Sequence, residues 1–108
     1  MHVNLGSFAG EYDGIGIING APIPSNGTGR PSAVIAGKRH EVYIRIRRAG
    51  SKAAVAVELD GKLHIEWSGD ISSLSVFDLW KLPQGTPAAL GIYDTVATFH
   101  SLELITSN

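Results

Sequence analysis

The chain has 108 residues, of which 44% are hydrophobic and 18% are charged, and its formal net charge is −1. A chain of this length builds one hydrophobic core, so we predict a single domain over residues 1–108. The charge offers no basic field to a nucleic acid or an anionic membrane, and the absence of cysteine excludes disulfides and thiolate metal sites.

Targeting signals are also missing from the sequence. No apolar stretch approaches the about 20 residues of a membrane span, so we expect no membrane association. The N-terminus has neither the basic start nor the long apolar run of a signal peptide. The sequence therefore does not choose a compartment, and an extracellular location stays open because secreted proteins lose their leader.

Short alternating apolar runs separated by turn residues predict strands. In chain order they lie at residues 3–8, 15–18, 32–37, 40–48, 52–58, 62–67, 88–93 and 96–105. Residues 19–32 hold three of the five prolines and read as a surface loop, and residues 77–81 predict one helical turn. No segment keeps a 3.6-residue period for ten residues. The predicted fold class is all-β, an antiparallel β-sandwich.

The Asp60-Gly61 pair stands between two alternating runs and predicts a tight hairpin. A two-residue loop would mix apolar and charged side chains on each face of the sheet. A three-residue loop that includes Leu59, with Gly61 as a bulge, puts Val57 opposite Leu63 and keeps the faces distinct. We therefore predict the three-residue loop, in which Asp60 is a turn residue whose side chain bonds nearby backbone.

The same alternation, with Arg48 and Ser51 flanking the preceding turn, assigns the faces of a three-stranded meander. The core face is predicted to hold Val42, Ile44, Ile46, Val55, Val57, Leu63, Ile65 and Trp67. The outer face carries Ala54 and Ala56 along the middle strand, which predicts a shallow trough between longer side chains. Two interpretations stay open: a ligand occupies the trough, or the loop of residues 68–87 covers it.

Polar and aromatic side chains line this trough, and we predict that they bind carbohydrate. An aromatic ring with hydrogen-bond donors and acceptors beside it suits a polyol. The predicted carbohydrate-binding residues are Tyr43, Arg45, His64 and Glu66.

The sequence predicts no catalytic residues, no metal site and no cofactor. In the predicted register Glu58 and Glu66 lie four pairing rows apart, with backbones roughly 13 Å apart, which is too far for the carboxyl pair of a glycoside hydrolase. The four histidines lack the spacing of metal ligands. The triplet Asn26-Gly27-Thr28 matches the N-glycosylation pattern in a predicted loop.

The segment GKRHEVYIRIRR…AAVAVELDGKLHIEW, followed by LWKLPQGTPAALGIYDTVATFHSLELI, has an ordered set of short motifs. An LDGK hairpin and a Trp come first, then a WKLP turn, an LG.Y strand and an FHS strand. With this order the chain resembles bacterial concanavalin A-like (laminin G-like) jelly-roll modules over residues 14–105. The resemblance implies a short version of that jelly roll and an association with carbohydrate, since such modules include lectin-like appendages and domains of sugar-processing enzymes.

Three functions remain open at this point. The leading hypothesis is a non-catalytic, lectin-like module with a glycan or polysaccharide ligand. The second is a structural module that self-assembles through open sheet edges, and the third is a sugar-processing hydrolase or lyase. The modules that the chain resembles carry further strands before the segment HVNLGSF, and residues 3–8 have no lysine to protect a strand edge. We therefore expect a homo-oligomer that pairs through the N-terminal strand.

Overall fold

The structure, a computed structural model, describes residues 1–76, 80–86, 88–92 and 97–105. The chain divides into two compact units, Met1–Phe77 and Asp78–Asn108. The elements of the first unit are, in chain order, β1 (Val3–Gly6), α1 (Ser7–Gly10), β2 (Tyr12–Ile15), η1 (Ile23–Ser25), β3 (Arg30–Pro31), β4 (Val42–Ala49), β5 (Lys52–Leu59), β6 (Lys62–Asp70) and η2 (Ile71–Ser73).

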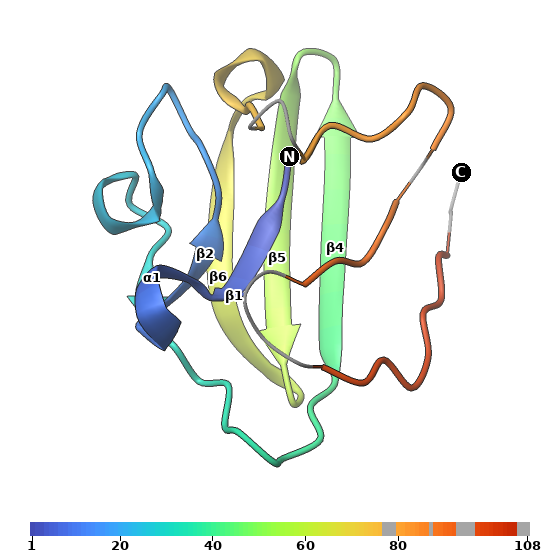
Figure 1. Cartoon of the computed structure of the whole chain (residues 1–108). Coiled ribbons are helices and arrows are strands. Elements are labelled where there is room, and N and C mark those ends of the chain that lie inside the picture. The colour runs from blue at the N-terminus through green and yellow to red at the C-terminus, as the bar shows by residue number, and fades with distance from the viewer. Residues whose placement is uncertain (77–79, 87, 93–96, 106–108) are drawn as a thin grey trace. The chain divides into compact units, whose positions relative to one another are not determined.

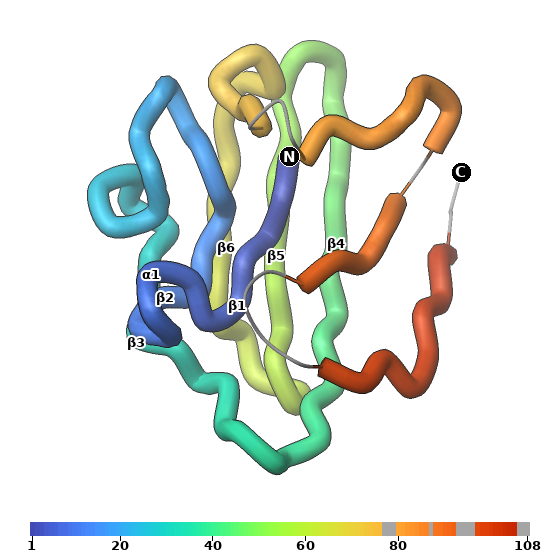
Figure 2. Tube along the Cα trace, viewed as in Figure 1, coloured from blue at the N-terminus to red at the C-terminus, as the bar shows by residue number. Residues whose placement is uncertain are grey.

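The strands form two antiparallel three-stranded sheets, one in the order β1-β2-β3 and the other in the order β4-β5-β6. In Figure 1, β1 and β2 cross in front of β5 and β6, and the tube of Figure 2 shows the same arrangement. In the described part of the chain, the one α-helical element, α1, has only four residues, and two of them, Phe8 and Ala9, have left-handed backbone. The all-β character predicted from the sequence is confirmed.

The hydrophobic core of the first unit draws on both sheets. Ile15 ends β2, and Ile18 follows it; both pack in one cluster with residues of β5 and β6. The members buried from the larger sheet are Val55, Val57 and Ile65, and Val3, Trp67 and Leu74 pack against them. Alternating burial along β5 explains this, because every second residue of that strand is buried.

The hairpin between β5 and β6 differs from the predicted one. Leu59 pairs with Lys62, so the loop contains only Asp60 and Gly61. Both residues have positive φ, 52° and 81°, which is the backbone of the tight hairpin turns whose twist matches that of the strands. The three-residue loop was therefore wrong: a two-residue turn already satisfies the twist of the strands.

A β-bulge then restores the separation of the two faces. The register shifts between Val57 and Glu58, so Glu58 pairs with Leu63 while Val57 pairs with Ile65. His64 is the extra residue. Leu63 was predicted to lie in the core, but it is 57% exposed and lies on the outer face. The parity argument was sound, but the unpaired residue lies in the strand and not in the turn.

The β4–β5 hairpin is shifted by one residue on each strand relative to the prediction. Ala49 pairs with Lys52, and the turn consists of Gly50 and Ser51. Gly50 has a φ of 61° at the first turn position, where glycine is favoured. Because both strands move by one residue, the faces keep their parity. The prediction that Arg48 and Ser51 flank the turn was therefore wrong.

The N-terminal region also departs from the predicted boundaries. β1 ends at Gly6, and β2 begins at Tyr12, three residues before the predicted start. Residues 19–32 are only partly a surface loop, because Ile23 and Thr28 are buried. Residues 32–37 form no strand, since pairing in this region is taken by Arg30 and Pro31 of β3. β1 is an edge strand, as its order in the sheet shows, and the oligomer expected through it stays a prediction.

The last two predicted strands belong to the second unit, and the helical turn predicted at residues 77–81 begins at the last residue of the first unit. Residues 88–92 and 97–105 form no strand, although they alternate apolar residues. Alternation predicts which face a side chain takes, but a strand also needs a neighbour for its hydrogen bonds. Residues 77–79, 93 and 96, which belong to the predicted turn and strands, lie outside the described residues.

Candidate functional site

A shallow hollow lies on the outer face of the larger sheet. Its volume is about 200 Å³, and its lining comes from all three strands: Tyr43, Arg45, Ala56, Glu58, Leu63 and Glu66. We call this the outer-face hollow. A second hollow of about 320 Å³ adjoins it and shares Tyr43, Arg45 and Glu58. Ala54 is exposed and Ala56 is half-buried, so the rest of the first unit does not cover the middle of this face.

The strand register explains why these side chains meet. Arg45, Ala56 and Glu66 form one row across the sheet, because Ala56 pairs with both neighbours. The guanidinium carbon of Arg45 lies 5.6 Å from the ring centroid of Tyr43, which is within the range of a cation–π contact. Among the described residues, no ion pair joins Arg45 to Glu58 or Glu66.

Three of the four predicted site residues therefore share the hollow, and the fourth does not. Tyr43, Arg45 and Glu66 line it, whereas His64 is absent from its lining. The bulge turns the imidazole of His64 toward the smaller sheet, where Nε2 lies 2.8 Å from Oδ2 of Asp13. A simple alternation along β6 put His64 on the outer face, and the extra residue of the bulge reverses its direction.

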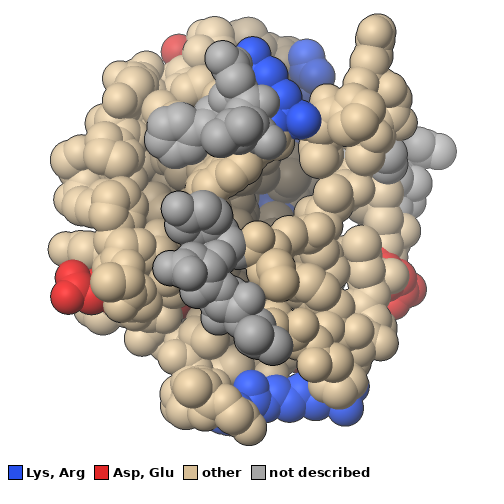
Figure 3. All heavy atoms as spheres, in the orientation of Figure 1, with Lys and Arg blue, Asp and Glu red and all other residues tan. Residues whose placement is uncertain are grey.

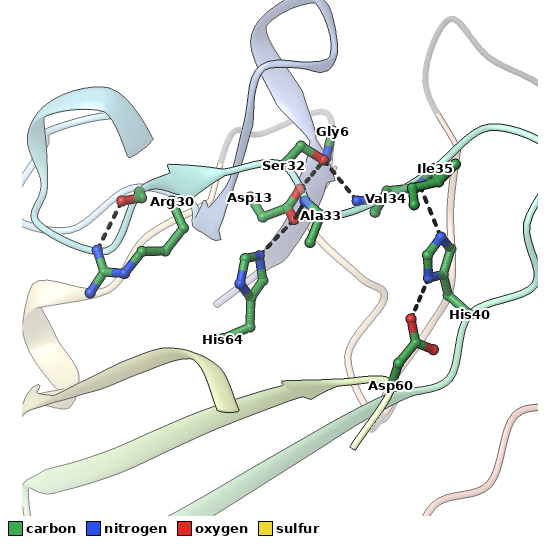
Figure 4. A network of polar contacts seen from close by, with 11 residues as sticks. Gly6, Asp13, Arg30, Ser32, Ala33, Val34, Ile35, His40, Asp60 and His64 are labelled. Carbon is green, nitrogen blue, oxygen red and sulfur yellow. Dashed lines mark hydrogen bonds and ion pairs between the residues drawn. The ribbon is translucent and has the colours of Figure 1, made fainter. Parts of the chain in front are cut away.

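Asp13 is the centre of a buried polar network that the sequence analysis did not identify (Figure 4). Its side chain has no exposed surface. Oδ1 accepts a hydrogen bond from the backbone N–H of Gly6 at 2.7 Å, and Oδ2 accepts one from that of Ala33 at 2.9 Å. The hydroxyl of Ser32 and the imidazole of His64 are its other partners. The carboxylate thus joins β1, β2, the chain after β3, and β6.

These hydrogen bonds decide the charge of Asp13. Burial by itself raises the pKa of a carboxyl group, but the donors from Ala33, Ser32, Gly6 and His64 stabilise the charged form and together lower the pKa of Asp13 below its usual value. Because Asp13 is fully enclosed and the side chain of His64 is only 16% exposed, the pair has no room for a substrate. We assign it a structural role. Asp13 lies two positions before the core residue Ile15 and therefore shares its face of the strand. This spacing was the one feature of the sequence that could have indicated that Asp13 is buried.

Asp60 is a turn residue, as predicted, but its side chain bonds residues about 20 positions earlier in the chain and not the nearby backbone. Oδ1 accepts a hydrogen bond from the N–H of Glu41 at 2.9 Å, and Oδ2 lies 2.6 Å from Nδ1 of His40. Nε2 of His40 accepts from the N–H of Ile35, so Nδ1 carries the proton that bonds Asp60. The hydrogen bond from Glu41 and then that from His40 lower the pKa of Asp60. The carboxylate ties the β5–β6 turn to the start of β4.

The N-glycosylation triplet is also structural. Nδ2 of Asn26 donates to the carbonyl oxygens of Ile15, Gly16 and Ala21, at 2.9, 2.6 and 3.2 Å. Thr28 is buried, and its hydroxyl accepts from the N–H of Ile15 and donates to Oδ1 of Asn26. In the folded protein the amide nitrogen that a glycan would need is therefore already occupied.

In the view of Figure 3, residues other than Lys, Arg, Asp and Glu make up most of the drawn surface, and the charged residues lie in separate small groups. Within the described part of the chain, no group of three His, Asp or Glu residues is placed to hold a metal ion. None of the helices in that part has the length and apolar character needed to cross a membrane.

The chain was also compared with known proteins. No protein-family model, curated protein or solved structure matches the chain.

Proposed function

We propose that the outer-face hollow binds a saccharide without transforming it, in a shortened β-sandwich of concanavalin A-like type. One observation carries the proposal: a half-exposed aromatic ring lies beside one guanidinium and two carboxylates in an open hollow. A sugar ring has apolar C–H faces that pack on an aromatic ring, and hydroxyl groups around its rim that both donate and accept hydrogen bonds.

The side chains of the hollow divide these tasks between them. Tyr43 is 47% exposed and offers ring surface for stacking. Arg45 only donates hydrogen bonds, whereas the carboxylates of Glu58 and Glu66 only accept them, so together they match hydroxyl groups of either orientation. The hollow is smaller than the pockets of about 300–1,000 Å³ that enclose drug-sized ligands. The ligand is therefore expected to lie across the surface, with one sugar ring on Tyr43.

A glycan array followed by titration calorimetry tests this function. We expect binding to at least one oligosaccharide and a loss of tenfold or more in affinity for Tyr43→Ala, which removes the stacking surface. Lys62→Ala is the matched control, since Lys62 pairs with the buried Leu59 and is not part of the hollow. The proposal fails if no glycan binds, or if Tyr43→Ala and Lys62→Ala bind equally well.

Glycoside hydrolysis is a second candidate, and the strand register is the observation that favours it. Glu66 pairs with Ala56, which is only two residues from Glu58. The pairing rows are therefore two apart and not four, and a diagonal of this kind spans about 7–8 Å between backbones. Inverting glycosidases hold their carboxyl groups about 6.5–9.5 Å apart. Turnover of a glycoside that is lost in both Glu58→Gln and Glu66→Gln would favour hydrolysis, whereas binding without turnover supports the lectin-like function.

A further inference from the structure

β4 has a free edge and an exposed apolar face. It is the outermost strand of the larger sheet, and no other strand in the described ranges pairs with its second edge. Its residues Val42, Ile44 and Ile46 are 40%, 43% and 56% exposed, although they share a face with the buried residues of β5. A strand of eight residues with this combination is a template for a further strand.

The direction of the backbone groups along β4 follows from one hydrogen bond. The carbonyl of Glu41 accepts from the N–H of Asp60, so residue 41 directs its backbone toward β5. In an antiparallel pair this direction alternates. Tyr43, Arg45 and Arg47 therefore also point their backbone groups at β5, and the even-numbered residues between them present N–H and C=O groups to the free edge.

The sequence of β4 is complementary to itself when it is reversed about Ile44. Val42 then meets Ile46 of a second copy, and Tyr43 meets Arg45 of the second copy, which extends the cation–π contact seen within one chain. Glu41 meets Arg47 of the second copy, and these are opposite charges. Apolar pairs thus fall on one face and polar pairs on the other.

Neighbouring registers lack this match. Reversal about Arg45 places two copies of that guanidinium opposite each other, and reversal about Ile46 places Arg45 opposite Arg47. Like charges directly opposite each other destabilise a pair of strands. Reversal about Tyr43 places the apolar Ile46 opposite His40, and it places Arg47 opposite Arg39. Over positions 41 to 47, the register centred on Ile44 pairs apolar residues with each other, Tyr43 with Arg45 and Glu41 with Arg47, and it places no like charges opposite each other.

We propose that two copies of this chain pair antiparallel along the free edge of β4, with Ile44 on the two-fold axis, to form one continuous six-stranded sheet. Such an interface is isologous, because each copy contributes the same strand. The interface needs no saccharide, although it shares Tyr43 and Arg45 with the outer-face hollow. It differs from the oligomer expected through β1. β1 offers an edge of four residues, whereas β4 offers eight.

Disulfide trapping tests the register, and the absence of cysteine from the chain removes any background. In Ile44→Cys the two thiols lie opposite each other with Cα atoms about 5.5 Å apart, within the about 4.4–6.8 Å of disulfides. In Ile46→Cys, on the same face, the two thiols are offset by four residues, or roughly 14 Å. With oxidised glutathione as oxidant, we expect Ile44→Cys to form a covalent dimer at least tenfold faster than Ile46→Cys.

Charge reversal provides a second test that leaves the apolar face unchanged. Arg47→Glu and Glu41→Arg each place like charges opposite each other at both ends of the interface, and we expect each to weaken the dimer roughly tenfold. The double variant Glu41→Arg/Arg47→Glu restores opposite charges and is expected to recover the dissociation constant to within about twofold. Lys62→Glu makes the same change of charge away from β4 and should leave the dimer intact.

Sedimentation equilibrium over a range of protein concentrations measures these constants. The proposal is overturned if the chain stays monomeric at every concentration, if the two cysteine variants cross-link at equal rates, or if the double charge variant dimerises no better than the single ones. A monomer in which the amides of Val42, Ile44 and Ile46, which face the free edge, resist hydrogen exchange would show that another segment of the same chain occupies this edge, which also overturns the proposal.

Discussion

Nε2 of His64 lies 2.8 Å from Oδ2 of Asp13, a residue that is 51 positions earlier in the chain. The contact joins the two sheets, because Asp13 belongs to β2 and His64 to β6. It depends on the bulge in β6, which directs His64 toward the smaller sheet. The arrangement of the first unit is thus fixed by a polar contact as well as by the apolar cluster.

Asp13→Asn is expected to lower the free energy of unfolding by about 3 kcal/mol, because it leaves donors facing an NH₂ group in a buried site. The carboxylate accepts hydrogen bonds at both oxygens, and an amide keeps only one acceptor. Urea denaturation followed by circular dichroism measures the change. Asp70→Asn is the control, since its ion pair with Lys52 is exposed and 3.5 Å long, and we expect it to cost less than about 0.5 kcal/mol.

Acid should destabilise the protein through the same residue. The pKa of Asp13 is lower in the folded state than its ordinary value of 3.8, so the unfolded state binds more protons as the pH falls. The stabilisation is complete above the ordinary pKa and is lost as the pH drops through the lowered one. Asp60, whose pKa is also lowered, contributes in the same direction. Unfolding free energies from pH 7 to pH 2 measure the loss.

The variant Asp13→Asn supplies the comparison for this titration. Because it lacks the shifted carboxyl group, its stability is expected to fall less steeply below the ordinary carboxyl pKa than that of the unchanged protein. Parallel curves for the two proteins would contradict the role assigned to Asp13.

Sequence reasoning predicted the meander well because its periodicity is local. Alternation along β5 and β6 identified Val55, Val57 and Ile65 as core residues, and all three are buried. The core prediction was wrong for Val42, Ile44 and Ile46 of β4, which share that face but are exposed. The exact pairing was missed, since one unpaired residue in the turn and one in the strand give the same parity of faces. The choice between them depends on the twist of the turn at Asp60 and not on hydrophobicity.

The candidate site was predictable to the extent that it follows from that periodicity. Tyr43 and Arg45 alternate with apolar residues on β4, whereas the position of His64 depends on the bulge. Asp13 lies between the predicted strands 3–8 and 15–18, whereas the structure places it in β2. Its four partners come from segments far apart in the sequence, and such contacts leave no periodic signal.

Asn26→Asp is expected to destabilise the protein by about 2 kcal/mol. The substitution replaces an NH₂ donor with an oxygen that faces the carbonyl oxygens of Ile15 and Gly16. Asn19→Asp is the matched control, because Asn19 is exposed in a turn with a φ of 50°, a conformation that Asp also tolerates. Thermal unfolding of the two variants compares them, and equal melting temperatures would count against the role of Asn26.

Val55→Asp should prevent folding, because it places a charge without a partner in the core beside Ile65. Ala54→Asp, one residue earlier, is expected to change stability by less than about 0.5 kcal/mol, since Ala54 is exposed and pairs with Arg47. Circular dichroism and size-exclusion chromatography distinguish the two outcomes. Similar losses in both variants would show that the faces of β5 are assigned incorrectly.

The contact between Asp13 and His64 also has a consequence for the order in which the molecule forms. The β4–β6 meander is built from two adjacent hairpins, each closed by a two-residue turn, so its loops close with little loss of chain entropy. The polar link between the sheets closes a loop of 51 residues and needs the bulge to be in place first. We therefore expect the meander to assemble early and the N-terminal sheet to dock onto it late. Substitutions at Asp13 should then accelerate unfolding while leaving the rate of folding almost unchanged.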